Sequence, residues 1–167
     1  MLFGLLQTEH VGIDVLDLLL EKGMAVATFF NTNRLILVSN FRLPFNLNAA
    51  SDLYHKPKNC LITVLQPVEH PDKLYLVANT HLYFSTNRGD TKMAMLKLLT
   101  EAVALVRDHY QAETKKQVLV FVCGDFNAAP RSGIYEFMRT GEYDCQTLSR
   151  NNISGQYHGT FKIGSVP

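Results

Sequence analysis

The chain has 167 residues, of which 47% are hydrophobic and 19% are charged, and its formal net charge is +1. This length and composition are typical of one ordinary globular domain, so we expect a single domain over residues 1–167. The small net charge argues against a protein that coats nucleic acid. It leaves open an enzyme that binds a few phosphates in a cleft, because local charge decides binding there.

The sequence predicts neither secretion nor membrane insertion. The segment before Gly23 is apolar in places, but acidic residues interrupt it and it has no basic region or small-residue cleavage site. No run of about eighteen apolar residues occurs, so we expect no membrane partner. The cysteines, Cys60, Cys123 and Cys145, form no CxxC pair, which favours a reducing compartment. We therefore expect an intracellular protein, cytoplasmic in the first place, with the nucleus and the mitochondrion left open.

The N-terminal part of the chain predicts a helix and then a hairpin. Apolar residues recur at helical spacing over residues 12–22, and Gly23 is a natural helix stop. Residues 24–30 and 35–39 are β-rich runs on either side of a short polar turn, which predicts a β-hairpin.

The middle of the chain predicts a loop and a second pair of strands. The polar stretch that contains Pro44 and Pro57 is typical of a loop. Residues 59–66 and 73–84 are strand-like runs, and the turn between them contains two prolines, so we expect them to pair.

The second half of the chain predicts helix, strand and helix. An apolar stripe defines a helix over Thr91–Tyr110, and residues 118–125 form a continuous apolar run, as expected for a strand covered on both faces. A short helix follows, with Ser132 as its N-cap and Gly141 as its C-terminal stop. Because no phosphate-binding glycine fingerprint is present, this mixture predicts a layered α/β fold rather than a doubly wound sheet.

Asp125 and Asn127 are the first candidates for chemistry, because they follow directly on the apolar strand. In an extended chain their side chains would point the same way. The carboxylate can accept a proton from water or bind a cation, and the amide can orient a phosphate oxygen. Gly124 lets the backbone approach a neighbour closely. The pattern alone fits an ordinary surface turn equally well.

His81 is the second candidate, at the end of the preceding strand-like run, where it shares a face with Asn79. A histidine there can donate to a phosphate oxygen, although an ordinary hydrogen-bonded histidine is the more frequent case. Arg88 and Lys92 follow and can meet phosphates, although a solvated loop and helix start explain them as well.

These motifs together resemble one enzyme family. NTHL at residues 79–82, then an amphipathic helix, then CGDFNAAPRSGIYEFMRTGEY at residues 123–143 resemble the deadenylase-like branch of the endonuclease/exonuclease/phosphatase superfamily. That branch contains carbon-catabolite-repressor deadenylases, nocturnin, angel proteins and 2′,5′-phosphodiesterases. The likeness runs from Gly23 to Gln156. The RGD at residues 88–90 and the SGQ at residues 154–156 are most similar to the angel proteins.

The resemblance implies a fold, a cofactor and a substrate. The fold would be part of a four-layer α/β sandwich of the deoxyribonuclease-I-like type. The activity would be that of a Mg²⁺- or Mn²⁺-dependent phosphodiesterase, a 3′-to-5′ exoribonuclease on poly(A) or 2′,5′-oligoadenylate. His81, Asp125 and Asn127 would be catalytic and Asp125 would also bind the metal, while Asn79 and Arg88 would bind substrate.

The family pattern asks for further motifs that are not found in these 167 residues. They are an Asn and a metal-binding Glu on earlier strands, a later Asp before a hydrophobic and aromatic pair, and a terminal Ser-Asp-His. The chain therefore resembles the middle of a catalytic domain. The alternative is a catalytically inactive, shortened family member that binds RNA or protein. A third interpretation, which we rank last, keeps the superfamily and takes DNA or a phosphoinositide as the substrate.

Overall fold

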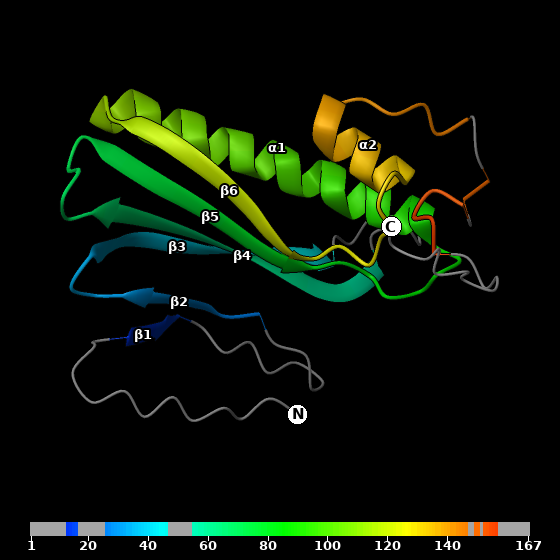
Figure 1. Cartoon of the computed structure of the whole chain (residues 1–167), viewed down its shortest axis with the longest axis horizontal. Coiled ribbons are helices and arrows are strands. Elements are labelled where there is room, and N and C mark those ends of the chain that lie inside the picture. The colour runs from blue at the N-terminus through cyan, green and yellow to red at the C-terminus, as the bar shows by residue number, and fades with distance from the viewer. Residues whose placement is uncertain (1–12, 17–25, 47–54, 147–148, 151, 157–167) are drawn as a thin grey trace, which may run out of the picture. The chain divides into compact units, whose positions relative to one another are not determined.

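The structure is a computed structural model that describes residues 13–16, 26–46, 55–146, 149–150 and 152–156 (Figure 1). It belongs to the α/β class, as the sequence predicts. Among the described residues, no helix is long and apolar enough to cross a membrane.

The strands form two sheets. β1 (Ile13–Leu16) and β2 (Thr28–Asn31) pair antiparallel and make the smaller sheet. The larger sheet has the order β3-β4-β5-β6 and consists of β3 (Leu35–Asn46), β4 (His55–Pro67), β5 (Lys73–His81) and β6 (Gln117–Asp125). The helices are α1 (Gly89–Thr114), between β5 and β6, and α2 (Gly133–Thr140), after β6.

The contacts divide the described residues into two compact units. The first takes in the described parts of residues 1–44, 59–80 and 100–124, and the second those of 45–58, 81–99 and 125–167.

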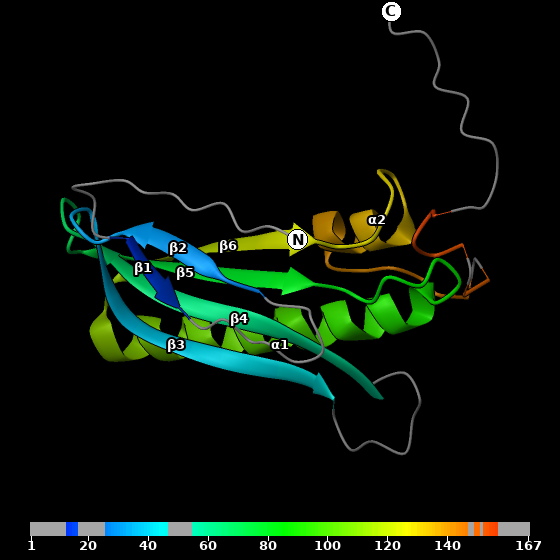
Figure 2. The same ribbon diagram turned by 90° about the horizontal axis from the view of Figure 1, so that it is seen from below.

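The core of the first unit lies on one face of the β4–β5 hairpin. The two strands pair antiparallel from Cys60 opposite Thr80 to Leu65 opposite Tyr75, which confirms the predicted pair. Along β5, alternate residues are buried and half-buried, as the period of two along a strand requires. Residues 100–114 of α1 lie along one side of this sheet (Figure 2).

β5 and β6 run in the same direction, with α1 as the connection between them (Figure 1). Parallel neighbours need such a crossover. Because the strands are parallel, their C-terminal residues, His81 and Asp125, come to the same edge of the sheet. The topology thus unites two residues that are 44 positions apart in the chain (125 − 81 = 44).

The second unit is built around the start of α1 and around α2. Its buried apolar side chains include Leu96, Leu99, Ile134 and Ile153. Both predicted caps of α2 are confirmed: Ser132 Oγ accepts from Tyr135 N, and Gly141 is left-handed with φ 80°.

Two predictions for the N-terminal part are wrong. Within the predicted helix, residues 13–16 form a strand because they pair with β2; Leu19 and Leu20 lie outside the described residues. The predicted hairpin is not formed either. Its turn exists, with Arg34 N donating to Asn31 O at 3.0 Å, but β2 and β3 join different sheets. Local periodicity cannot foresee such pairing, which long-range contacts decide.

Where the structure describes the predicted loop around the prolines, it is strand, and residues 47–54 lie outside the described residues. β3 continues through Pro44 to Asn46, and β4 contains Pro57. β3 is an edge strand, where a proline costs no ladder hydrogen bond on its outer side. Pro57 precedes Cys60, where the register with β5 begins.

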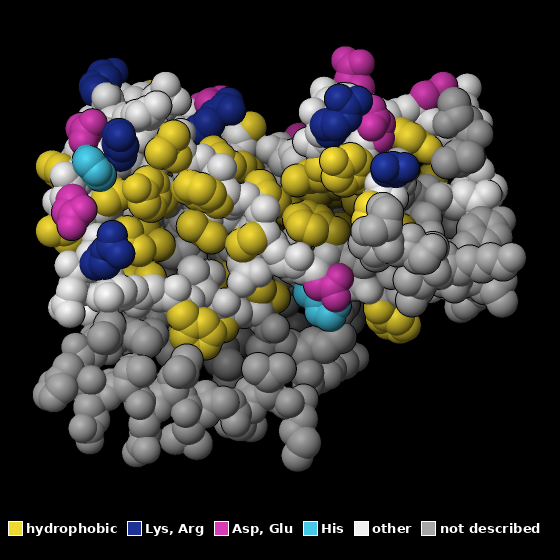
Figure 3. Space-filling view, viewed as in Figure 1, with side chains coloured by type: hydrophobic (Ala, Val, Ile, Leu, Met, Phe, Trp, Pro, Cys, Tyr) yellow, Lys and Arg dark blue, Asp and Glu magenta, His cyan; other side chains and the backbone are white. Residues whose placement is uncertain are grey.

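The expectation that β6 is covered on both faces is also wrong for the described residues. β6 is the other edge of the sheet, and Val120 and Phe121 are 37% and 49% exposed. Phe121 packs edge-on against Tyr75 of β5, with ring centroids 5.7 Å apart. Hydrophobic side chains gather over β5 and β6 in Figure 3. The apolar run therefore lies on an open sheet face.

Candidate active site at the ends of β5 and β6

The end of β6 lies unusually close to the end of β5. Gly124 has φ +126°, and a Cβ at this position would lie 1.8 Å from the carbonyl oxygen of Thr80. Only glycine allows this approach, as the sequence suggested. The next residue of β6 is Asp125, and its carbonyl oxygen accepts a hydrogen bond from Leu82 N at 2.9 Å.

This approach brings together the two titratable candidates. His81 Nε2 and Asp125 Oδ2 are 3.6 Å apart, which is an ion-pair distance when the histidine is protonated and slightly beyond a hydrogen bond. The side chains are 36% and 64% exposed, so both can be reached from solvent. The pair can therefore present an acid and a base to one bound group.

Asn127 reaches the site in a different way from the one predicted. β6 ends at Asp125, and Asn127 has φ +47°, so the alternation of an extended strand does not extend to it. Instead Asn127 N donates to Asp125 Oδ1 at 2.8 Å, the geometry of an Asx turn. Asn127 Nδ2 donates to Leu82 O at 3.0 Å. An amide has two N–H donors, so this bond uses one of them.

The environment of Lys92 differs from the one that the sequence suggests. The explanation of Lys92 as part of a solvated helix start is wrong, because its side chain is 0% exposed. Its Nζ donates to Asn127 O at 2.8 Å and to Gln156 Oε1 at 2.5 Å. Burial lowers the pKa of Lys92 from 10.5 to about 8, against the attraction of Asp125, which raises it. Gln156 was part of the SGQ motif, but nothing in the sequence indicated that it would meet Lys92.

The two predicted substrate-binding residues already have protein partners. Asn79 Nδ2 donates to Ala27 O at 2.9 Å and so fixes the segment before β2. Arg88 Nε lies 3.0 Å from Asp90 Oδ1, and both side chains are mostly buried. The structure thus brings His81, Asp125 and Asn127 together with Lys92. A role of Asn79 or Arg88 toward substrate stays a prediction.

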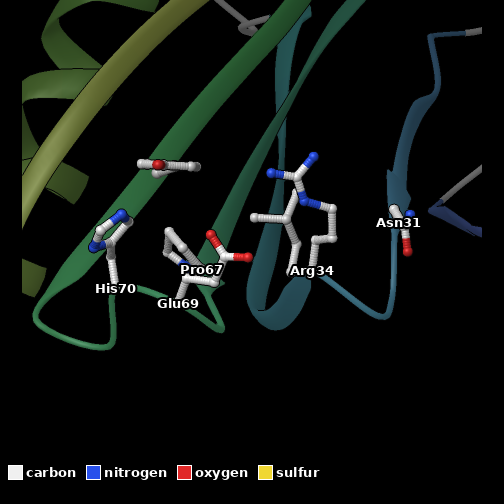
Figure 4. A pocket seen from close by; sticks show the side chains of 7 residues that line it. Asn31, Arg34, Pro67, Glu69 and His70 are labelled. Carbon is white, nitrogen blue, oxygen red and sulfur yellow. The ribbon is translucent and has the colours of Figure 1, made fainter.

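A cavity of about 390 Å³ in the first unit lies beside the turn between β4 and β5 (Figure 4). Arg34, Glu69 and His70 are among its lining residues, and none of the site residues lines it. It borders the beginning of β5, whereas His81 is the last residue of that strand. This cavity is therefore separate from the candidate site.

Comparison with known proteins places this geometry in a family. No protein-family model matches the chain. Protein angel homolog 2 of Danio rerio is 31% identical over 132 residues, which are 78% of this chain and 22% of that protein. The 2′,5′-phosphodiesterase 12 of Bos taurus is 30% identical over 136 residues, 70% of this chain and 22% of the relative.

A solved structure agrees with these relatives. The crystal structure of ANGEL2, a 2′,3′-cyclic phosphatase, in complex with adenosine-2′,3′-vanadate superposes with a TM-score of 0.74 at 26% identity. The match covers 89% of this chain and 42% of ANGEL2. The chain belongs to the deadenylase-like branch of the endonuclease/exonuclease/phosphatase superfamily. The predicted deoxyribonuclease-I-like fold is confirmed with it.

The chain matches only part of the length of its relatives. The chain spans about a fifth of the length of the two curated relatives named above. Two of the matched proteins are named for hydrolysis of a phosphoester: the 2′,5′-phosphodiesterase 12 and the 2′,3′-cyclic phosphatase whose structure was compared. Phosphoester hydrolysis is thus the chemistry that these members of the branch share.

Proposed function

We propose that the protein hydrolyses a phosphoester bond of RNA with a divalent cation, Mg²⁺ or Mn²⁺. The observation that carries this proposal is the pair of His81 and Asp125, 3.6 Å apart at the ends of neighbouring parallel strands. Both side chains are accessible, and both match the motifs by which the chain resembles its family. The Asx turn holds Asn127 next to Asp125, because Asn127 N donates to Asp125 Oδ1.

Each of the site residues would have its own role in the reaction. Asp125 accepts a proton from the attacking water, whose oxygen forms the new bond to phosphorus. His81 donates a hydrogen bond to a phosphate oxygen as negative charge develops there. The second N–H of the Asn127 amide holds another phosphate oxygen. The bond from phosphorus to the leaving ribose oxygen breaks, and that oxygen takes up a proton.

Asp125 could supply one carboxylate ligand to a metal ion. Mg²⁺ is held in enzymes by one or two carboxylates together with water and substrate phosphates. Asp125 offers such a carboxylate, exposed and at the strand end. The described residues contain no group of three His, Cys, Asp or Glu side chains that could hold a metal. When bound, the cation would polarise the phosphoryl group and offset its charge.

Two kinds of bond are candidates for the substrate. The first is the terminal phosphodiester of an adenylate-rich RNA, cleaved from the 3′ end of poly(A) or of 2′,5′-oligoadenylate. The second is a 2′,3′-cyclic phosphate, which is favoured by the likeness to the vanadate complex of ANGEL2. Both reactions are attack on phosphorus with a ribose oxygen as leaving group.

A non-catalytic function is the competing proposal, namely an RNA- or protein-binding module. It is supported by the absence, among the described residues, of any group of three His, Cys, Asp or Glu side chains that could hold a metal. It makes a distinct prediction, because RNA would bind without being cleaved.

One substrate panel separates these proposals. Purified protein is incubated with 3′-labelled 3′,5′-oligoadenylate, 2′,5′-oligoadenylate and an RNA that ends in a 2′,3′-cyclic phosphate, in Mg²⁺, Mn²⁺ or EDTA. We expect turnover of at least one substrate in metal and none in EDTA. Binding of all three without turnover in either metal would reject hydrolysis and support the binding module.

A further inference from the structure

The side chain of Lys92 is buried within the second unit. Burying a charge is costly unless it is paired and hydrogen-bonded. Here Nζ has two protein acceptors, Asn127 O and Gln156 Oε1. Two of the three N–H donors are thus taken by protein acceptors, and the side chain is 0% exposed, so a phosphate ligand has no direct access to it. Lys92 is therefore arranged to hold the protein rather than the substrate.

The residue that Lys92 holds has a left-handed backbone. Asn127 has φ +47°, a conformation that L side chains rarely adopt and that asparagine tolerates when local hydrogen bonds support it. Its N–H is fixed by Asp125 Oδ1 and its side chain by Leu82 O. Its other backbone polar group, the carbonyl oxygen, is held by Lys92. These contacts over-determine the position of Asn127.

The second partner of Lys92 belongs to a turn that is itself well anchored. Ser154 O accepts from Ala129 N at 2.8 Å, and Ile153 O accepts from Ile134 N at 3.3 Å. The turn is thus attached to the loop after β6 and to the start of α2. Gln156 follows this turn and presents Oε1 to the ammonium group. Lys92 consequently joins α1 both to the loop after β6 and to the segment that contains Gln156.

We propose that Lys92 is a positioning residue, whose ammonium group, steadied by Gln156, fixes the backbone of Asn127 and thereby the carboxylate of Asp125. The coupling passes through the Asx turn, since Asn127 N is the donor to Asp125 Oδ1. The inference rests on the proposed function for its effect on catalysis. Its geometric part concerns the loop alone and can be measured without substrate.

The test compares Lys92→Met with Lys97→Met, the same substitution at an exposed position of α1. Amide hydrogen exchange is followed at Asn127 and, as a reference, at Leu76 within the β4–β5 pairing. In Lys92→Met we expect exchange at Asn127 to be faster by about tenfold or more and exchange at Leu76 to be unchanged. In Lys97→Met both should match the unmodified protein.

Gln156→Met gives a second variant if Lys92→Met does not fold, because it removes an acceptor and leaves the charge. It should accelerate exchange at Asn127 in the same selective manner. A uniform acceleration at Asn127 and Leu76, or none at Asn127, would overturn the proposal by showing a merely structural role for Lys92.

Kinetics complete the test on whichever substrate is turned over. A positioning role predicts that kcat falls about 10- to 100-fold while KM changes little, because the reacting groups are misplaced rather than lost. Selective exchange with unchanged kcat would overturn the link to catalysis. Selective exchange with no turnover by any form, the unmodified protein included, would support the positioning of the loop and reject the proposed function.

Discussion

Asp125→Asn is expected to lower kcat/KM about 10²- to 10⁴-fold on any phosphoester that the protein hydrolyses. The substitution removes the charge that accepts a proton from water and attracts a cation, while the side chain keeps its size. The new Oδ1 can still accept from Asn127 N, so the Asx turn and the loop should persist. The measurement is a Michaelis analysis in Mg²⁺ with both proteins at matched concentration.

Asp72→Asn is the matched control, because Asp72 is an exposed acid at the turn that leads into β5. Its activity should stay within about twofold of the unmodified protein, since surface substitutions away from special features have small effects. Equal losses in the two variants, or full activity of Asp125→Asn, would remove Asp125 from the chemistry.

Gly124→Ala is expected to reduce the free energy of unfolding by about 3–5 kcal/mol, or to prevent folding. Two effects combine: the added Cβ would lie 1.8 Å from Thr80 O, and φ +126° is unfavourable for any L side chain. Because the obstacle is a backbone atom of β5, relief requires the two strand ends to separate. Denaturation in urea measures the loss.

Gly141→Ala separates these two effects. Gly141 also has a positive φ, +80°, but nothing lies within 4 Å of a Cβ placed there. It should cost only about 1 kcal/mol. A loss at Gly124 no larger than at Gly141 would show that the close approach of β5 and β6 does not constrain the site.

The elements that the sequence predicts well are those whose signals are local. α2 carries its own N-cap and C-terminal glycine, and the β4–β5 pair has two strand-like runs on either side of one turn. β1 and β6 fail for the opposite reason. Whether residues 13–16 become strand depends on pairing with β2, and the burial of Phe121 depends on what packs against the sheet. The local sequence of neither segment predicts which part of the chain will pair with it or pack against it.

The residues of the candidate site also differ in how far local sequence signals predict their positions. His81 and Asp125 were predictable because each ends a strand and both match family motifs, and parallel strands bring their ends together. Strand alternation predicts that Asn127 lies beside Asp125, whereas in the structure an Asx turn brings the two residues together. The buried Lys92 donates to Gln156, 64 residues further along, and no local pattern predicts such a contact.

The central claim is that His81 and Asp125 act as one catalytic unit, and a double-mutant cycle tests it most directly. The cycle measures kcat/KM for His81→Gln, Asp125→Asn and the double variant on the substrate that is turned over. Because the groups are 3.6 Å apart and serve one transition state, we predict strongly non-additive losses. The double variant should be only slightly worse than the worse single variant. Losses that multiply, or a single variant with full activity, would contradict the claim.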